Sequence, residues 1–197
     1  MKGARVLRLA TLILLAGCFL VLGLLVRARR AAAIPVFGPA PAFVLTNSFG
    51  KAVSREDLLG RVWVVDFFFT TCPGICPVLS TNLAAAQAAL PDGADVRLIS
   101  ITVNPDCDTP DVLNAYAARY GADADRWFFL TGPPEEIARL SREGFRLGSL
   151  EQPVFHSGRF VLVDRRARIR AYYDGTDARA VPALVRDIRR LLRERGP

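Results

Sequence analysis

The sequence predicts an α/β fold with a mostly parallel central sheet, preceded by one apolar N-terminal segment. Two observations carry this prediction. Buried, β-rich runs alternate with helical segments after residue 62, and a further strand pair and a helix end the chain. With 51% hydrophobic and 23% charged residues, the 197-residue chain does not have the composition of a disordered protein. It is long enough for one buried core beside the N-terminal segment.

The N-terminal segment 9–26 (LATLILLAGCFLVLGLLV) carries no charge. As a helix it would span about 27 Å, close to the hydrocarbon core of a bilayer. A cleaved signal peptide has a shorter apolar core of about 7–15 residues. We therefore expect a transmembrane anchor at 9–26, after a cytoplasmic basic segment at 1–8. Cys18 lies in a lipoprotein-like Leu-Ala-Gly-Cys context, but the apolar run continues past it, which favours a cysteine inside a membrane helix.

The net charge of +7 lies almost entirely in this region. Residues 1–30 hold six basic residues and no acid, which leaves 20 basic and 19 acidic residues for the rest of the chain. A nearly neutral body argues against a nucleic-acid partner, although the pI of 9.8 alone would suggest one. Residues 27–41, rich in Ala, Pro and Gly, are predicted to be a linker, and residues 42–197 a single domain.

The domain is predicted to begin with a hairpin of strands Phe43–Leu45 and Lys51–Val53. Ser54 is a plausible cap, with Asp57 three residues on, for a short helix that ends at Gly60. The run Val62–Phe69 (VWVVDFFF) predicts a strand buried on both faces.

The remaining elements are predicted from the same patterns. Strands are expected at Val96–Val103, Trp127–Leu130, Phe160–Val163 and Ile169–Tyr173, and helices at Val78–Leu90, from Asp108 to Tyr120, at Pro134–Arg142 and at Val181–Arg195. Asp108-Thr109-Pro110 combines a cap with a proline in the first helical position. The element order, which ends in a hairpin and a helix, is the thioredoxin-like arrangement.

Two cysteines stand where the chain passes from the strand Val62–Phe69 into the next helix, in the segment TTCPGICP. Loops at the carboxyl end of a central strand lie where open α/β sheets bind ligands. If the segment is helical, Cys72 and Cys76 share one face, and their sulfurs meet as a disulfide or as two ligands of one metal. A helix N-terminus also lowers the pKa of a cysteine. A purely structural disulfide would constrain little of the unfolded chain.

His156 is the only histidine. In a thioredoxin-like fold, the loop that enters the strand Phe160–Val163 faces the cysteine loop. Two thiolates and one imidazole suit Cu(I) and are tolerable for Cu(II). Structural zinc wants a fourth ligand, which Cys107 would supply, so a Cys₃His zinc site remains an alternative.

Three segments resemble the Sco/SenC family: FFFTTCPGICPVLS, SITVNPDCDTPDVLNAYAARYG and HSGRFVLVDRRARIRAYYDG. This family consists of membrane-anchored copper proteins of thioredoxin fold, which deliver copper to the binuclear copper centre of cytochrome c oxidase or reduce its cysteines. The resemblance implies that Cys72, Cys76 and His156 bind copper. The sequence departs from the usual family pattern at two places, and both bear on which partner the protein recognises. Gly74 replaces the usual Asp, and Asn104-Pro105 with Cys107 replaces an Asp-Pro with a downstream Arg.

The first hypothesis is therefore a copper metallochaperone. It would act in the bacterial inner membrane with its domain in the periplasm, and its partners would be the copper-site subunit of cytochrome c oxidase and another periplasmic copper carrier. The alternative is a thiol–disulfide oxidoreductase, which needs Cys72 and Cys76 as redox-active residues but not His156. A copper- or redox-responsive signalling protein would use the same residues. We interpret Asp108 as a helix cap, Asp164 as a turn residue and the C-terminal arginines as a solvated helix face.

Overall fold

The computed structural model describes residues 14–23, 34–147 and 157–194. The chain divides into two compact units, 1–35 and 36–197. In the first unit, residues 14–23 are helical with exposed side chains. None of the helices within the described ranges has both the length and the apolar character required to cross a membrane. Residues 9–13 and 24–26 of the predicted anchor lie outside those ranges.

The second unit is built on one eight-stranded sheet with the order β1-β8-β7-β4-β5-β6-β2-β3. The strands are β1 (Gly38–Pro39), β2 (Val44–Asn47), β3 (Ala52–Ser54), β4 (Val62–Phe68), β5 (Val96–Thr102), β6 (Trp127–Thr131), β7 (Arg159–Val163) and β8 (Arg168–Asp174). The helices are the 3₁₀ turn η1 (Glu56–Leu58), α2 (Ile75–Ala89), α3 (Pro110–Arg119), α4 (Pro134–Arg139), the π-helical turn η2 (Leu140–Gly144) and α5 (Ala180–Arg193).

The prediction of an α/β fold is confirmed, but the prediction of a mostly parallel sheet is wrong. Only β4–β5 and β5–β6 run parallel among the described strand pairs. The β2–β3 hairpin joins β6 antiparallel, while β7, β8 and β1 continue antiparallel from β4. The sheet is therefore mixed. The hydrophobic pattern of the sequence locates the strands, but it does not tell which edge of the sheet a terminal hairpin joins.

The central strand β4 is buried along all seven residues, as its apolar sequence predicts. Its side chains alternate between two cores. Trp63 packs edge-to-face with Phe43 and Phe145 on one side of the sheet. Phe68 packs with Phe129 and Tyr116 of α3 on the other.

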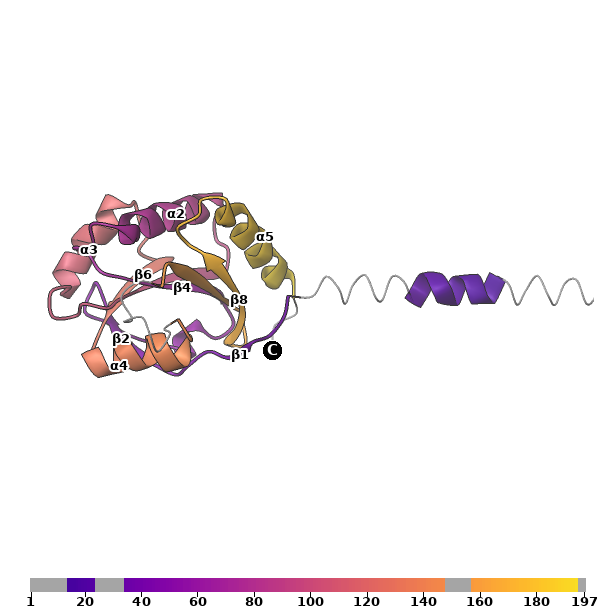
Figure 1. The fold of residues 1–197 in the computed structure, drawn as a ribbon, viewed down its shortest axis with the longest axis horizontal. Helices are drawn as coiled ribbons and strands as arrows, with labels where there is room; N and C mark the ends of the chain where they lie inside the picture. The colour runs from indigo at the N-terminus through magenta and orange to yellow at the C-terminus, as the bar shows by residue number, and fades with distance from the viewer. Residues whose placement is uncertain (1–13, 24–33, 148–156, 195–197) are drawn as a thin grey trace, which may run out of the picture. The chain divides into compact units, whose positions relative to one another are not determined.

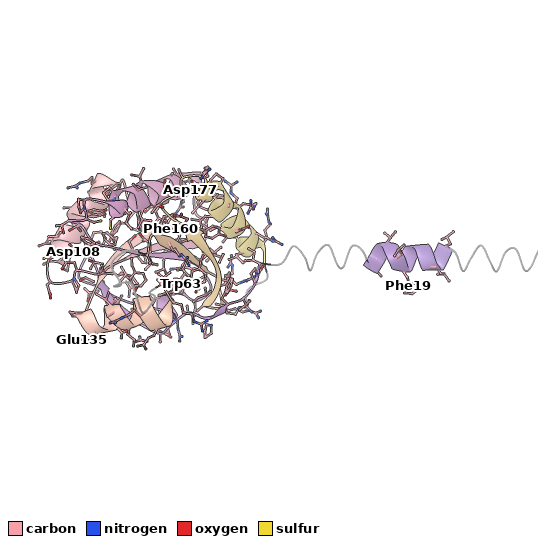
Figure 2. All side chains as sticks on the ribbon, viewed as in Figure 1. Phe19, Trp63, Asp108, Glu135, Phe160 and Asp177 are labelled. Carbon is pink, nitrogen blue, oxygen red and sulfur yellow. The ribbon has the colours of Figure 1, made fainter. Side chains whose placement is uncertain are left out.

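Three helices cover one face of the sheet and the shorter helical segments cover the other. Figure 1 shows α2, α3 and α5 on one side and α4 on the opposite side. Figure 2 labels Trp63 between the sheet and α4 and Phe160 on the side of α2. The carboxyl ends of β4 and β5 therefore lead into α2 and into the loop before α3, on the face that α2 and α3 cover.

Two elements differ from the predicted boundaries. Gly38 and Pro39, which we placed in the linker, pair with Ile169 and Arg168 of β8, so the end of that segment belongs to the sheet. The helix predicted at Pro134–Arg142 stops at Arg139 and continues as a π-helical turn.

Candidate functional site

The two cysteines lie in the connection between β4 and α2. Cys72 stands in the turn, where its N–H donates to the Phe69 carbonyl at 3.3 Å, and Cys76 stands in the first turn of α2. Because the helix begins at Ile75, the two residues are not one helical turn apart on a shared helix, as the conditional prediction supposed. The structure nevertheless brings them together, since the Cys76 thiol donates a hydrogen bond to the Cys72 sulfur. Both are buried, free cysteines.

The pKa values of the two thiols are driven apart. Burial alone would raise the pKa of Cys72, but hydrogen bonds from the Cys76 backbone N–H, the Cys76 thiol and the N–H groups of Gly74 and Ile75 outweigh it, and the net pKa is lowered. Burial and the neighbouring Cys72 sulfur raise the pKa of Cys76 to about 12. Cys72 is therefore the preferred thiolate and Cys76 the thiol that donates to it.

Asp66 is a third ionisable group of this site, and it is not among the residues predicted from the sequence. It is a 1% exposed carboxylic acid on β4. Its Oδ1 accepts from Ser100 Oγ at 2.6 Å, and its Oδ2 has no hydrogen-bond partner among the described residues. Burial raises the pKa of Asp66 to about 7, and its charge contributes to the raised pKa of Cys76. The available signal was a single acid within the apolar run VWVVDFFF, six residues before Cys72.

Asp108 braces the cysteine loop, which corrects its interpretation as a helix cap. The cap of α3 is Thr109, whose side chain accepts from the Val112 N–H, with Pro110 in the first turn. The carboxylate of Asp108 is instead fully buried and accepts from Thr70 N at 3.1 Å and from Thr70 Oγ1 at 2.5 Å. It also accepts from Thr102 Oγ1, at the end of β5. Asp108 thus ties the loop after β4 to the end of β5.

Cys107, next to Asp108 in the connection between β5 and α3, is exposed. Its N–H donates to the Asn104 carbonyl at 3.1 Å. Over the described ranges, no group of three or more His, Cys, Asp or Glu side chains is arranged to hold a metal ion. Cys107 therefore does not complete a three-ligand site with Cys72 and Cys76 in this conformation.

His156 lies outside the described residues, so its predicted role as a ligand stays a prediction. The described chain resumes at Ser157, and Gly158 lies beside the cysteine loop. A Cβ at Gly158 would be 3.6 Å from Cδ1 of Ile75, which stands between the two cysteines, and 2.7 Å from Thr176 Cγ2. The Gly158 carbonyl accepts from the Gly175 N–H at 2.7 Å. The chain therefore enters β7 next to the start of α2.

Comparison with known proteins gives one consistent result. The family model described as SCO1/SenC matches residues 37–193. The SCO1 protein homolog of Bacillus subtilis is 34% identical over 153 residues, which are 75% of this chain and 79% of that protein.

Solved structures agree with the sequence relatives. BsSco, described as a member of the Sco family of cytochrome c oxidase assembly proteins with a disulfide switch, superposes with a TM-score of 0.73 at 30% identity, covering 83% of this chain and 99% of that one. Bradyrhizobium japonicum ScoI, solved with copper bound, superposes with a TM-score of 0.64 at 25% identity, covering 78% of this chain and 99% of that one.

Proposed function

This chain belongs to the SCO1/SenC family, and we propose that it binds copper through Cys72, Cys76 and His156. Its cargo is passed to the binuclear copper site of cytochrome c oxidase, or its thiols prepare the cysteines of that site. The proposal extends to this chain what is described for its relatives: ScoI has been solved with copper bound, and BsSco is a cytochrome c oxidase assembly protein.

The observation that carries the proposal is the pair of free thiols at the start of α2. One thiol has a lowered pKa and the other a raised one, and a hydrogen bond joins them. Soft thiolate ligands select Cu(I). When the ion binds, Cys72 contributes a sulfur that is already favoured as thiolate, and Cys76 must lose its proton to solvent.

The position of Gly158 beside Ile75 supports His156 as the third ligand. The segment that carries His156 returns to the sheet at the cysteine loop, two residues after the histidine. A neutral imidazole would complete a set of two sulfurs and one nitrogen. Three ligands leave a copper ion accessible to the thiols of an acceptor, which suits a protein that must release its cargo.

Copper titration of the full chain tests the proposal. We expect one Cu(I) per chain, and loss of tight binding in Cys72→Ser, Cys76→Ser and His156→Ala. Cys107→Ser is the matched control, because this exposed cysteine follows the neighbouring strand β5 and is outside the ligand set. Full binding by Cys76→Ser, or loss of binding in Cys107→Ser equal to that in Cys72→Ser, would contradict the assignment.

Thiol–disulfide exchange is the second candidate function, and the split pKa values favour it as well. The Cys72 thiolate would attack a partner disulfide, forming a mixed disulfide and releasing one partner thiolate. Cys76, once deprotonated, would attack the Cys72 sulfur and release the second partner thiolate. The partner gains two electrons, and the Cys72–Cys76 pair ends as a disulfide.

Replacing His156 distinguishes the two functions, because thiol exchange does not need an imidazole ligand. Oxidase activity is measured in cells that carry His156→Ala or Cys72→Ser as their only copy of the protein. If copper transfer is the main role, both variants lose oxidase activity. If His156→Ala retains it, thiol exchange is the main role.

We further propose that residues 9–26 anchor the chain in the bacterial inner membrane with the domain in the periplasm. The support is the uncharged 18-residue run and the chemistry of the acceptor centre. An alkaline phosphatase fusion after Glu194 should be active, and one that precedes residue 9 should be inactive. The opposite pattern would reverse the proposed topology.

A further inference from the structure

A hollow runs along α5, on the face of the molecule that α5 shares with α2. Figure 1 shows α5 in yellow beside α2. The hollow has a volume of about 510 Å³, and its lining combines apolar residues with three arginines: Ala89, Val181, Pro182, Val185, Arg186, Arg189 and Arg193. We call this surface the α5 hollow. It lies outside the cysteine site, and nothing in the proposed copper chemistry uses it.

The arginines of the α5 hollow are only partly neutralised. The two acids of the last turns are engaged by the sheet: Asp187 accepts from the Tyr173 hydroxyl at 2.8 Å, and Glu194 accepts from Arg170 at 2.8 Å. Arg186 reaches Asp187 at 3.2 Å, and Arg189 donates to the Ala89 carbonyl at 2.7 Å. Arg193 is exposed, with no hydrogen bond or ion pair to any described side chain.

The charge is concentrated at one end of the helix. At the N-terminal end, Arg179 pairs with Asp177, which Figure 2 labels, at 3.0 Å. At the other end Arg189 and Arg193 have no acidic partner of this kind within the described chain. The hollow is therefore most strongly cationic toward the C-terminus of α5.

This cationic end is connected to the place where the domain begins. Glu194, just after α5, is paired with Arg170 of β8. The preceding residues of β8, Arg168 and Ile169, pair with β1. Val36 and Phe37, directly before β1, are about half exposed, at 50% and 51%. The exposed apolar side chains of Val36 and Phe37 thus lie next to β8, whose Arg170 pairs with the residue that follows α5.

We propose that the α5 hollow binds the surface of the membrane through anionic lipid headgroups. Arg189 and Arg193 would contact headgroup phosphates, and the apolar floor would cover the glycerol region. The proposal rests on the membrane anchoring of the proposed function, because a short tether at this end keeps the surface at high local lipid concentration. Each arginine near an anionic bilayer is worth about fivefold in binding. Docking of this kind would fix the orientation of the cysteine site relative to the bilayer.

The test uses the full chain in nanodiscs of phosphatidylcholine alone or with one-third phosphatidylglycerol. Arginines are modified with phenylglyoxal, and the rate at each residue is read by mass spectrometry. Arg189 and Arg193 should react about fivefold more slowly in the anionic nanodiscs, and the difference should vanish at 1 M salt. Arg142, which is exposed on η2 at the opposite face, is the internal control and should react equally in both.

Equal rates for Arg189 in both lipids overturn the proposal, as does protection of Arg142 to the same extent. Protection by inorganic phosphate in phosphatidylcholine nanodiscs overturns it in favour of a small-anion site, and protection only by an added acidic protein overturns it in favour of a protein partner. A chain that does not remain with the nanodisc contradicts the anchoring instead. Arg186, which also lines the α5 hollow, should be protected by anionic lipid in the wild type and should lose this protection in the Arg189→Gln, Arg193→Gln double variant. Unchanged copper stoichiometry of the double variant verifies its fold.

Discussion

At the carboxyl end of β4 and β5, the buried carboxylates Asp66 and Asp108 accept hydrogen bonds from neutral groups, whereas at the opposite end Asp164 is held by two arginines. Asp164, in the turn after β7, accepts from Arg168 Nε at 2.9 Å and from Arg170 at 2.8 Å. Asp66 accepts a hydrogen bond from the Ser100 hydroxyl on Oδ1, and no arginine or lysine pairs with it among the described residues.

The difference between the two ends corresponds to a difference in role: the Asp164 end stabilises the fold, and the cysteine end is the proposed copper site. Arginines lower the pKa of Asp164 against the effect of its burial, so this end is held by paired charges. At the cysteine end a nearby cation would compete with a copper ion and would stabilise Cys76 as thiolate before copper arrives. Neutral hydrogen-bond donors hold the loop in place without competing with copper and without stabilising the Cys76 thiolate.

The largest expected effect is a change in the pH dependence of the free energy of unfolding when Asp66 is replaced. Burial raises the pKa of Asp66 from 3.8 to about 7, so the folded state holds its proton more tightly than the unfolded chain. The stability from this group is complete below about pH 4 and is lost as the pH rises through about 7. Asp66→Asn should therefore be more stable than the wild type by about 4 kcal/mol above pH 8.

Urea unfolding at about pH 5 and about pH 8 measures this effect. The difference between variant and wild type should grow over that interval. Ser100→Ala serves as a companion variant, because it removes the hydrogen bond but keeps the carboxyl group, and it should retain the pH dependence. A constant difference between Asp66→Asn and wild type would mean that Asp66 does not titrate in this interval.

Arg170→Ala should cost about 3 kcal/mol, because it leaves Asp164 and Glu194 without their shared partner in a buried setting. Arg168→Ala is the matched control. Arg168 bonds the same carboxylate but is 37% exposed, so its loss should cost less than about 1 kcal/mol. Both variants should bind copper like the wild type. Equal losses of stability in the two variants, or weaker copper binding by Arg170→Ala, would contradict the distinction between a structural end at Asp164 and a copper-binding end at the cysteines.

Asp108→Ala should cost about 2 kcal/mol and should also weaken copper binding. It removes the acceptor of the Thr70 N–H, the Thr70 hydroxyl and the Thr102 hydroxyl, and thereby loosens the loop that carries Cys72. Asp106→Ala, in the same connection but exposed, is the control and should change neither property. Unfolding and Cu(I) competition report the two effects. Unchanged copper affinity in Asp108→Ala would make Asp108 structural only.

Copper affinity should rise with pH by at least about tenfold per unit between about pH 7 and pH 9, because the Cys76 proton must leave when copper binds. Because the pKa of Cys76 is raised to about 12, copper must displace its proton. Competition with a chelator of known pH dependence measures the slope. A flat profile would show that Cys76 is already a thiolate or is not a ligand.

The site was predictable where local sequence determines it. The apolar run that forms β4 and the paired cysteines after it place both thiols at the carboxyl end of a central strand. Pro110 and Thr109 mark the start of α3. These features depend on residues within a few positions of each other, which sequence patterns capture.

The missed features depend on long-range contacts. Asp108 has the sequence context of a cap, but Thr109 takes that role and the Asp108 side chain turns inward to Thr70, 38 residues earlier. Asp66 lies within the apolar run that predicts a core strand, and its hydrogen-bond partner Ser100 is on a different strand, β5. The local sequence therefore did not indicate a role for its carboxyl group. The two residues of β1 carry no strand pattern and pair only because β8 offers a free edge.

X-ray absorption spectroscopy of the Cu(I)-loaded full chain tests the central claim most directly. The account predicts two sulfur ligands and one nitrogen ligand, with loss of the nitrogen in His156→Ala and no change in Cys107→Ser. A spectrum with three sulfur ligands that reverts to two in Cys107→Ser would contradict it, and so would a nitrogen contribution that survives the loss of His156.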